Sequence, residues 1–276
     1  MIIFKLYDKF GVNNLPAIII NYFTCYITAT LYTGTIPTNQ NTLNEAWFIP
    51  AIFLSAVFIL IFYLTAVCIQ QLGMAKTIVY QKMSLIAPAI LGLCFFGEFI
   101  SFEKVTGIIL AILAVYALSG LNPDKSSGKF FNSKYEAFGI LVFLGSCCID
   151  GTLYLLETTD TVTNADVNFV AHLFLFAGIL GSLFLAFKYI NGTKIPIRIK
   201  DVLGGIALGV PNFFTIYLIF RILNSGFDGS SFFPIQNVGI LALATLTGIL
   251  IFNEKLTRLN KMGLFLAFLT IILLSQ

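Results

Sequence analysis

The sequence predicts an all-α polytopic membrane protein built from two inverted-topology repeats. Three observations predict this fold: a composition poor in charge, apolar runs long enough to cross a bilayer, and an internal repeat whose copies carry opposite charge bias. Of the 276 residues, 58% are apolar and 11% are charged, whereas a soluble domain carries roughly 25% charged residues. So few charges cannot cover a water-exposed surface, so lipid is the expected solvent over most of the protein.

The apolar residues are grouped into nine runs, and a helix needs about 20 residues to cross a bilayer. The runs do not alternate in polarity, and an open sheet would leave backbone groups unpaired in lipid, so we expect helices. Residues 1–4 resemble the end of a further helix. We therefore predict nine complete transmembrane helices plus an N-terminal stub of a tenth, at 15–33, 47–69, 75–96, 104–120, 136–156, 167–189, 202–222, 230–252 and 260–275.

Positive charge alternates between the links that separate these spans. If the stub is counted as the first helix, only Lys104 and Arg221 lie on even-numbered links, and Lys82 lies inside a span. Cationic loops face the cytoplasm, so we expect the odd-numbered links to be cytoplasmic and the C-terminus to be outside. The odd links hold the other 13 cations: Lys5, Lys9, Lys76, Lys125, Lys129, Lys134, Lys188, Lys194, Arg198, Lys200, Lys255, Arg258 and Lys261.

An internal repeat appears when the chain is shifted by 156 residues, which aligns 75–120 with 231–276 without a gap. In both copies a span ends in a glutamate, Glu98 or Glu254, and a glycine follows nine residues later. The copies lie five helices apart, so they are expected to cross the membrane in opposite senses, with the two glutamates at helix ends on opposite sides. Carriers use such inverted repeats for alternating access.

The domain organisation follows from this repeat and from one long polar link. We expect a first repeat at 1–121, with its first helix truncated, a polar linker at 122–134 and a second repeat at 135–276. Because a bundle lacking a helix would expose polar groups to lipid, we favour a true start upstream of Met1 over a genuinely shortened first half.

The two glutamate-containing stretches, from Gly97 to Gly107 and from Asn253 to Gly263, resemble the ends of the two EamA repeats of the drug/metabolite transporter superfamily. This resemblance implies ten helices in two inverted halves around a central cavity. It also implies export or exchange of a small metabolite, and it says little about which one.

Lys82 and Asp150 are the strongest candidate site residues because each lies inside a predicted span. An intramembrane charge is costly and is a functional-site hypothesis by default. We expect both to face one cavity, with an ion pair as one arrangement and Lys82 as an anchor for an anionic or zwitterionic substrate. The alternatives are that Lys82 extends its ammonium to the membrane surface and that Asp150 has a structural role. If Asp150 takes up a proton, it would couple transport to the proton gradient.

Neutral polar residues supply the remaining candidates. Under the same shift of 156, Tyr80 and Gln81 correspond to Gln236 and Asn237, and all four could line the cavity or join helices. Asn21, Asn212 and the sole histidine, His172, are weaker candidates, because a lone membrane histidine is more often a helix contact. The substrate-binding candidates are thus Lys82, Asp150, Tyr80, Gln81, Gln236, Asn237, Asn21 and His172.

The predicted function is secondary transport of a small polar metabolite, by export or exchange, around a midplane cavity. A non-transporting receptor or scaffold and an intramembrane enzyme are the alternatives. A single histidine and the absence of a nucleophile motif argue against the enzyme, and the absence of a phosphate-binding loop argues against an ATP-driven pump. We expect no catalytic residues, no metal and no cofactor.

The expected partners are a small-molecule substrate and the lipid bilayer. A homodimer and proton coupling are both open. No basic run of the kind that binds nucleic acid is present, so none is expected as a partner. We predict an integral protein of the bacterial inner membrane, with its five cysteines reduced.

Overall fold

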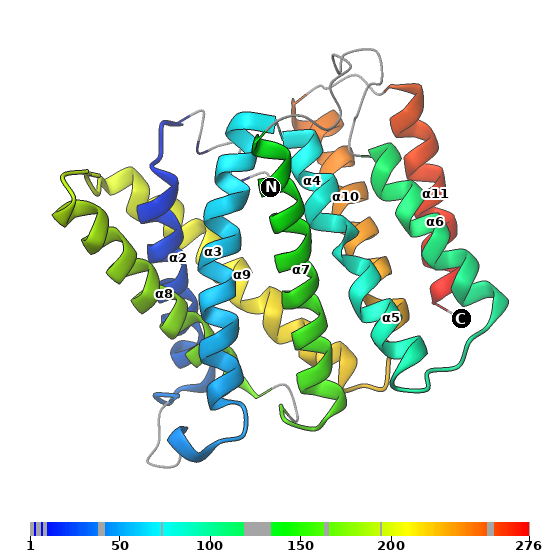
Figure 1. The fold of residues 1–276 in the computed structure, drawn as a ribbon, viewed down its shortest axis with the longest axis horizontal. Helices are drawn as coiled ribbons and strands as arrows, with labels where there is room; N and C mark the ends of the chain where they lie inside the picture. The colour runs from blue at the N-terminus through cyan, green and yellow to red at the C-terminus, as the bar shows by residue number, and fades with distance from the viewer. Residues whose placement is uncertain are drawn as a thin grey trace. The chain divides into compact units, whose positions relative to one another are not determined.

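The regular structure of the described residues is helical, as predicted (Figure 1). A computed structural model describes Ile3, Tyr7 and residues 10–37, 42–72, 74–118, 134–162, 166–193, 195–252 and 257–275. Two short 3₁₀ segments, η1 and η2, accompany the α-helices. The elements are α2 (Asn14–Thr33), η1 (Thr42–Asn44), α3 (Phe48–Leu72), α4 (Met74–Lys82), η2 (Met83–Leu85), α5 (Ile86–Cys94), α6 (Phe102–Leu118), α7 (Lys134–Thr158), α8 (Val167–Ile190), α9 (Ile199–Leu223), α10 (Gly229–Phe252) and α11 (Arg258–Leu274).

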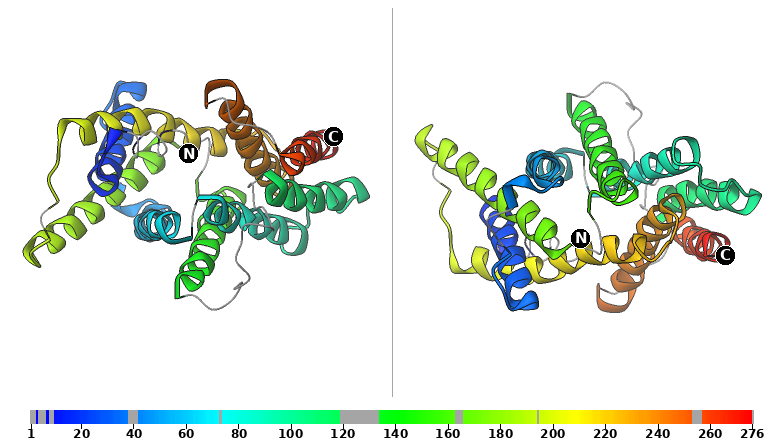
Figure 2. Two further views of the ribbon diagram at one scale, coloured as in Figure 1. Left: turned by 90° about the horizontal axis from the view of Figure 1, so that it is seen from above. Right: turned by 90° about the horizontal axis from the view of Figure 1, so that it is seen from below.

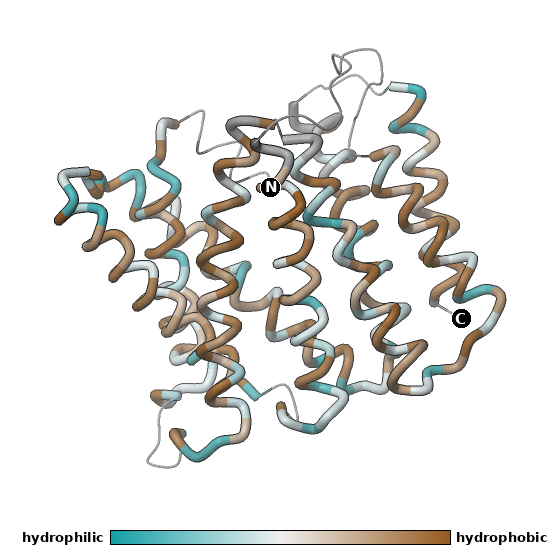
Figure 3. Tube along the Cα trace, viewed as in Figure 1, coloured by the Kyte–Doolittle hydropathy of each residue, from teal (hydrophilic) through white to brown (hydrophobic). Residues whose placement is uncertain are grey.

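Seven helical segments of the described chain are long and apolar enough to cross a membrane, and hydrophobic colouring predominates along the helices in Figure 3. The chain is therefore an integral membrane protein. The seven are Asn14–Thr33, Phe48–Ile69, Thr77–Cys94, Ala137–Thr158, Val167–Ile190, Ile199–Leu223 and Gly229–Thr247. The two other predicted spans coincide with α6 and α11, each of 17 residues. The total of nine crossings stays a prediction.

Three predicted features lie wholly or largely outside the described residues. They are the stub at residues 1–4, the polar linker at 122–134 and the link that contains Glu254. The charge rule for those links therefore stays a prediction, as does the orientation of the chain in the membrane.

Contacts between Cα atoms divide the chain into two compact units. Unit 1 comprises Met1–Tyr63 and Leu155–Ser225, and unit 2 comprises Leu64–Tyr154 and Gly226–Gln276. Each unit draws on both predicted repeats, and the boundaries fall inside α3 and α7. A contact unit is a different grouping from a sequence repeat, so the predicted repeat boundaries stay predictions.

Unit 1 is organised around α2, which packs against α8 and α9. Two glycines of α9 let the helix backbones approach closely: a Cβ at Gly205 would lie 2.7 Å from the Ala17 carbonyl oxygen, and one at Gly209 would lie 2.7 Å from that of Asn21. Small residues permit such close approach in membranes. Aromatic rings fill the interior, including Tyr22, Phe169, Phe174, Phe213 and Phe220, all fully buried.

The polar groups of unit 1 bind mainly to backbone atoms. Asp201, fully buried near the start of α9, accepts hydrogen bonds from the backbone N–H groups of Asn13 at 2.7 Å and Arg198 at 2.8 Å. The Tyr7 hydroxyl donates to the Gly204 carbonyl oxygen at 2.7 Å. Burial raises the pKa of Tyr7 to about 12, so this hydroxyl remains a neutral donor at physiological pH. These contacts join the segment before α2 to the beginning of α9.

Within unit 2, α6 and α11 lie side by side (Figure 2), and their contacts show an antiparallel pair with a symmetric interface. Gly107, in the second turn of α6, packs against Leu274 at the end of α11, and Gly263, in the second turn of α11, packs against Leu118 at the end of α6. A shift of 156 residues converts the first contact into the second. The corresponding residues between them, Ala111 and Ala267, are also buried, so the interface has the Gly-x-x-x-Ala pattern of close-packed membrane helices.

The segment α4–η2–α5 is a broken helix that also belongs to unit 2. The 3₁₀ turn at Met83–Leu85 interrupts it near its middle. Pro88 explains the break, because proline has no N–H for the carbonyl of Ser84, four residues earlier. Helix α10 packs against α5, α6 and α11, so the broken helix and α10 bring the two predicted repeat copies together.

Candidate functional site

Lys82, the last residue of α4, meets α10 through Asn237. Its Nζ donates to Asn237 Oδ1 at 3.0 Å. The shift of 156 residues aligns Gln81 with Asn237. Lys82 therefore contacts the residue of the second copy that corresponds to Gln81, the residue directly before Lys82. Under a two-fold relation, a position meets its own counterpart only close to the axis. The contact therefore has the register expected of a site on a pseudo-two-fold axis.

Asn237 retains an unused donor. Its side chain is 4% exposed, and its Nδ2 atom has no hydrogen-bond partner among the described residues. The orientation of the amide follows from chemistry, because a lysine ammonium only donates and must therefore face the oxygen. The amide nitrogen is then the orphan, and such a group normally costs free energy unless a partner binds it.

Asp150, on α7, belongs to the same region of unit 2. Its Oδ2 accepts a hydrogen bond from the Ser84 hydroxyl at 2.5 Å, and Ser84 lies in the 3₁₀ turn. Lys82 and Asp150 each have their own direct partner, and no salt bridge between them is found among the described residues. The direct ion pair is therefore not observed, and the cavity that both were expected to face stays a prediction.

Tyr80, Gln81 and Gln236 are partly buried in the same unit. Tyr80 packs against α7, where a Cβ at Gly139 would collide with its ring. A second glycine of α7, Gly151, faces α5, with Leu91 Cδ1 at 3.3 Å from the position of a Cβ. These glycines keep α7 close to the broken helix. Six of the eight predicted site residues thus belong to unit 2.

Asn21 and His172 belong to unit 1, where they serve as packing contacts. Asn21 Oδ1 accepts a hydrogen bond from Asn212 Nδ2 at 3.2 Å, joining α2 to α9. His172 is 3% exposed, its Nδ1 lies 2.7 Å from the Asn168 carbonyl oxygen, and its ring packs 5.4 Å from that of Trp47. This arrangement favours the helix-contact interpretation for both residues.

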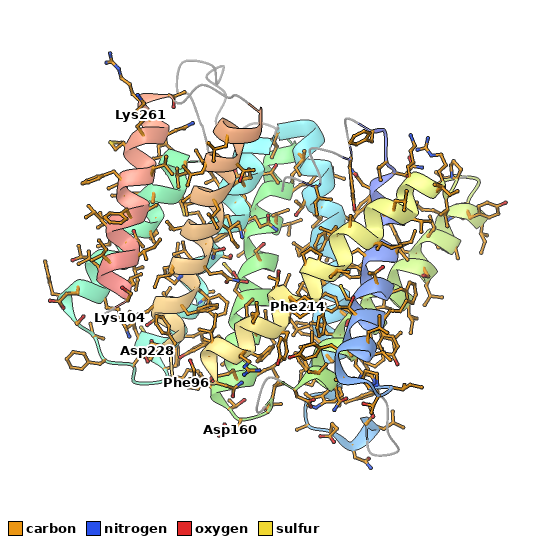
Figure 4. The ribbon with its side chains drawn as sticks, turned by 180° about the vertical axis from the view of Figure 1, so that it is seen from behind. Phe96, Lys104, Asp160, Phe214, Asp228 and Lys261 are labelled. Carbon is orange, nitrogen blue, oxygen red and sulfur yellow. The ribbon has the colours of Figure 1, made fainter. Side chains whose placement is uncertain are left out.

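A second polar cluster of unit 2, centred on Glu98, was not predicted. Its Oε1 accepts from the Tyr154 hydroxyl at 2.6 Å, and its Oε2 accepts from the Ser230 hydroxyl and from Lys104 Nζ at 3.3 Å. Lys104 also binds Asp228 at 2.6 Å (Figure 4). The side chains of Glu98 and Lys104 are only about one-tenth exposed, at 9% and 10%. The cluster joins the α5–α6 link, the end of α7 and the start of α10.

Local backbone conformation places Glu98 in this cluster. Gly97 adopts a φ of 67°, which glycine tolerates without steric cost. The chain reverses there, and the Glu98 N–H donates to the Gly92 carbonyl oxygen at 3.0 Å, which ends α5. Glu98 lies at a helix end, as predicted, and binds Lys104 in the first turn of α6 as well as residues of α7 and α10.

Two of the site residues that the sequence analysis did not predict lie close in sequence to residues that it did predict. Ser84 lies two positions after Lys82, and Tyr154 lies four after Asp150, on the same face of a helix. The contacts of Glu98 with Ser230 and of Lys104 with Asp228 join residues more than 120 positions apart, and no local pattern indicates them.

The polar groups of the Lys82 region are of the kinds that bind small polar molecules. It offers an ammonium donor, an amide donor, a hydroxyl and a carboxylate. No group of three or more His, Cys, Asp or Glu side chains that could hold a metal ion is found among the described residues.

Comparison with known proteins identifies a similar fold but does not indicate an activity for this chain. No protein-family profile matches the chain. An uncharacterized protein of Haemophilus influenzae is 26% identical over 206 residues, which cover 74% of this chain and 67% of that protein. A crystal structure with no stated function is similar at a TM-score of 0.69 and 12% identity, covering 96% of this chain and 89% of the other. The chain therefore shares its fold with a protein of known structure.

Proposed function

We propose that this integral membrane protein is a secondary transporter that exports or exchanges a small polar metabolite by alternating access. Its ten-helix plan would comprise nine complete helices and the end of a tenth, arranged as two inverted repeats of the EamA type in a bacterial inner membrane. Lys82, Asp150 and Asn237 would lie at the substrate site near the midplane.

The symmetric contact between α6 and α11 carries this proposal. The pairs Gly107–Leu274 and Gly263–Leu118 are related by the same shift of 156 residues that aligns the sequences. The two helices are antiparallel, which supports opposite directions for the two copies that contain them. Opposite direction is the property that distinguishes an inverted repeat from a parallel one.

The broken helix supports a binding site at its centre. Many carriers bind substrate where transmembrane helices are interrupted near the midplane. Here the interruption at η2 supplies Ser84, follows Lys82 directly and contacts Asp150. Charged groups deep in apolar helices are expensive, so their grouping beside a helix break favours a substrate site over a role in packing.

The proposal is tested by counterflow in proteoliposomes loaded with a panel of metabolites. A carrier should show saturable uptake of labelled substrate that accelerates when the unlabelled substrate is present on the other side. Uptake that is linear with concentration and has no counterflow would indicate a channel, and no movement of any compound would contradict transport.

Proton coupling through Asp150 is a separate component of the proposal. Asp150→Asn removes the titratable group while keeping its shape and its capacity to accept from Ser84. Coupled transport predicts that substrate-dependent proton flux disappears in this variant. A proton flux equal to that of the unmodified protein would reject the coupling and leave the transport function standing.

The opposite orientation of the two repeats is tested by labelling single introduced cysteines in a background without native ones. Position 100, after Glu98, is expected to react with an impermeant thiol reagent from outside. Position 256, after Glu254, is expected to react only once the cytoplasmic side is exposed. Labelling of both positions from the same side would overturn the inverted repeat.

A further inference from the structure

Lys82 and Asn237 bring an ammonium and an unpaired amide donor close together. Nζ lies 3.0 Å from Oδ1 of Asn237, and with amide bonds of about 1.23 and 1.33 Å the Nδ2 atom lies no more than about 5.6 Å from Nζ. A lysine ammonium has three donors, and one of them is used in this bond. The remaining donors and the orphaned Nδ2 are therefore within reach of the two oxygens of one small acceptor group.

Burial makes the missing acceptor significant. Asn237 is 4% exposed, so bulk water is an unsuitable partner for its amide. The other buried orphan groups of the described residues are Tyr22 Oη, Thr65 Oγ1, Asn260 Oδ1 and Thr270 Oγ1. Asn237 Nδ2 differs from them because a charged donor, Lys82, lies beside it.

The acceptor must also suit the charges nearby. Asp150 lies beside the same turn of the broken helix, because its Oδ2 accepts from the hydroxyl of Ser84, two residues after Lys82. When both groups are charged, the lysine and the aspartate together have a net charge of zero. A dianionic group such as a phosphate monoester would be repelled by Asp150, whereas a carboxylate has a single charge and two acceptor oxygens.

We infer that Lys82 and Asn237 form a subsite for the carboxylate group of a small molecule. This inference rests on the proposed transport function and adds the chemical class of the substrate. In the occupied site, one carboxylate oxygen accepts from Lys82 Nζ and the other accepts from Asn237 Nδ2. Asp150 excludes ligands whose head group has two negative charges.

The test compares matched carboxylates and carboxamides on the purified full-length protein. The probes are isobutyrate with isobutyramide, benzoate with benzamide, and alanine with alaninamide, together with glycerol phosphate. A binding carboxylate should raise Tm by about 5 °C at a concentration a hundredfold above its Kd. Its carboxamide and the phosphate should leave Tm unchanged.

Asn237→Asp is the decisive variant. The new carboxylate is the same size as the amide and forms an ion pair with Lys82. It therefore takes the place of the ligand's carboxylate at Lys82. We expect carboxylate affinity to fall at least tenfold. Asn237→Ser, which also lacks the amide donor, repeats the test should the aspartate variant fail to fold. The control is Asn212→Asp, which changes a membrane asparagine of unit 1 and should retain the response.

The outcomes separate this inference from the proposed function. A carboxylate response that persists in both Asn237 variants overturns the subsite, as does a panel in which no carboxylate changes Tm. If counterflow is then found with a neutral or cationic metabolite, the transport function stands and the carboxylate subsite is wrong. If no compound shows counterflow, the transport function itself is contradicted.

Discussion

The two contact units treat buried polar groups differently. In unit 1 several such groups pair with one another or with the backbone: Asn212 with Asn21, and Ser55 with the Leu173 carbonyl oxygen at 2.7 Å. The unpaired group of the described part of unit 1 is the neutral hydroxyl of Tyr22. In unit 2 an ammonium, a carboxylate and an unpaired amide donor lie around a broken helix. Because charged groups deep in apolar helices are costly, the comparison favours unit 2 as the location of the proposed site.

The largest expected effect is at the Glu98 cluster. Lys104→Met leaves the buried Glu98 carboxylate without a cation, which should lower the free energy of unfolding by about 3 kcal/mol. The measurement is denaturant unfolding in detergent. Lys188→Met is the matched change in unit 1, where Nζ lies 4.8 Å from the centroid of the Tyr63 ring, and it should cost less than about 1 kcal/mol.

A double variant sharpens that result. Glu98→Gln removes the charge that Lys104→Met leaves unpaired, so the combined variant should recover part of the lost stability. A combined loss equal to the sum of the single losses would show that the two side chains act independently.

The next effect concerns ligand binding. Lys82→Gln keeps a donor but removes the charge, which should weaken substrate binding roughly tenfold or more, since hydrogen bonds to charged groups contribute about 1.5–3 kcal/mol. His172→Gln in unit 1 should leave the affinity within about twofold of its original value. Concentration-dependent counterflow measures both. Equal losses in the two variants would remove the functional distinction between the units.

At the symmetric interface between α6 and α11, we expect two similar losses of stability. Gly107→Leu and Gly263→Leu each place a side chain where a neighbouring atom lies 2.6 Å or 2.9 Å from the new Cβ. Each should cost about 1–3 kcal/mol by overpacking, and the two costs should be similar. A large cost in one variant and none in the other would break the symmetry on which the proposed function rests.

The smallest effect is expected in unit 1. Asn212→Leu removes the hydrogen bond to Asn21, and such bonds between membrane helices contribute about 0.6 kcal/mol on average. A loss above about 2 kcal/mol in thermal or denaturant unfolding would show that unit 1 depends on its polar contacts far more than the comparison implies.

Much of the helical fold could be predicted because bilayer thickness and the apolar runs set helix length locally. The predicted 104–120 and 260–275 differ from α6 and α11 by only one or two residues at each end. The association of Lys82 with Asn237 was also within reach, because the repeat had already aligned their neighbourhoods.

The rest of the site depends on which helix faces meet, and sequence spacing does not reveal that. Asp150 could have faced Lys82 directly, yet the 3₁₀ turn rotates Ser84 into that position. Asn21 and His172 are, like Asn237, polar residues within predicted spans, but both form hydrogen bonds with neighbours in unit 1. Glu98 was predicted as a helix end, and its contacts with α7 and α10 required the packed helices.

The short helices α6 and α11 have a consequence for the surrounding lipid. At 1.5 Å per residue, their 17 residues extend about 26 Å, whereas the 25 residues of α9 extend about 38 Å. A hydrocarbon layer of about 30 Å would exceed the first length and fall short of the second. If α6 and α11 cross the bilayer as predicted, acyl chains beside this pair would have to compress while α9 tilts, so bilayers made from lipids with shorter chains should favour this pair in particular.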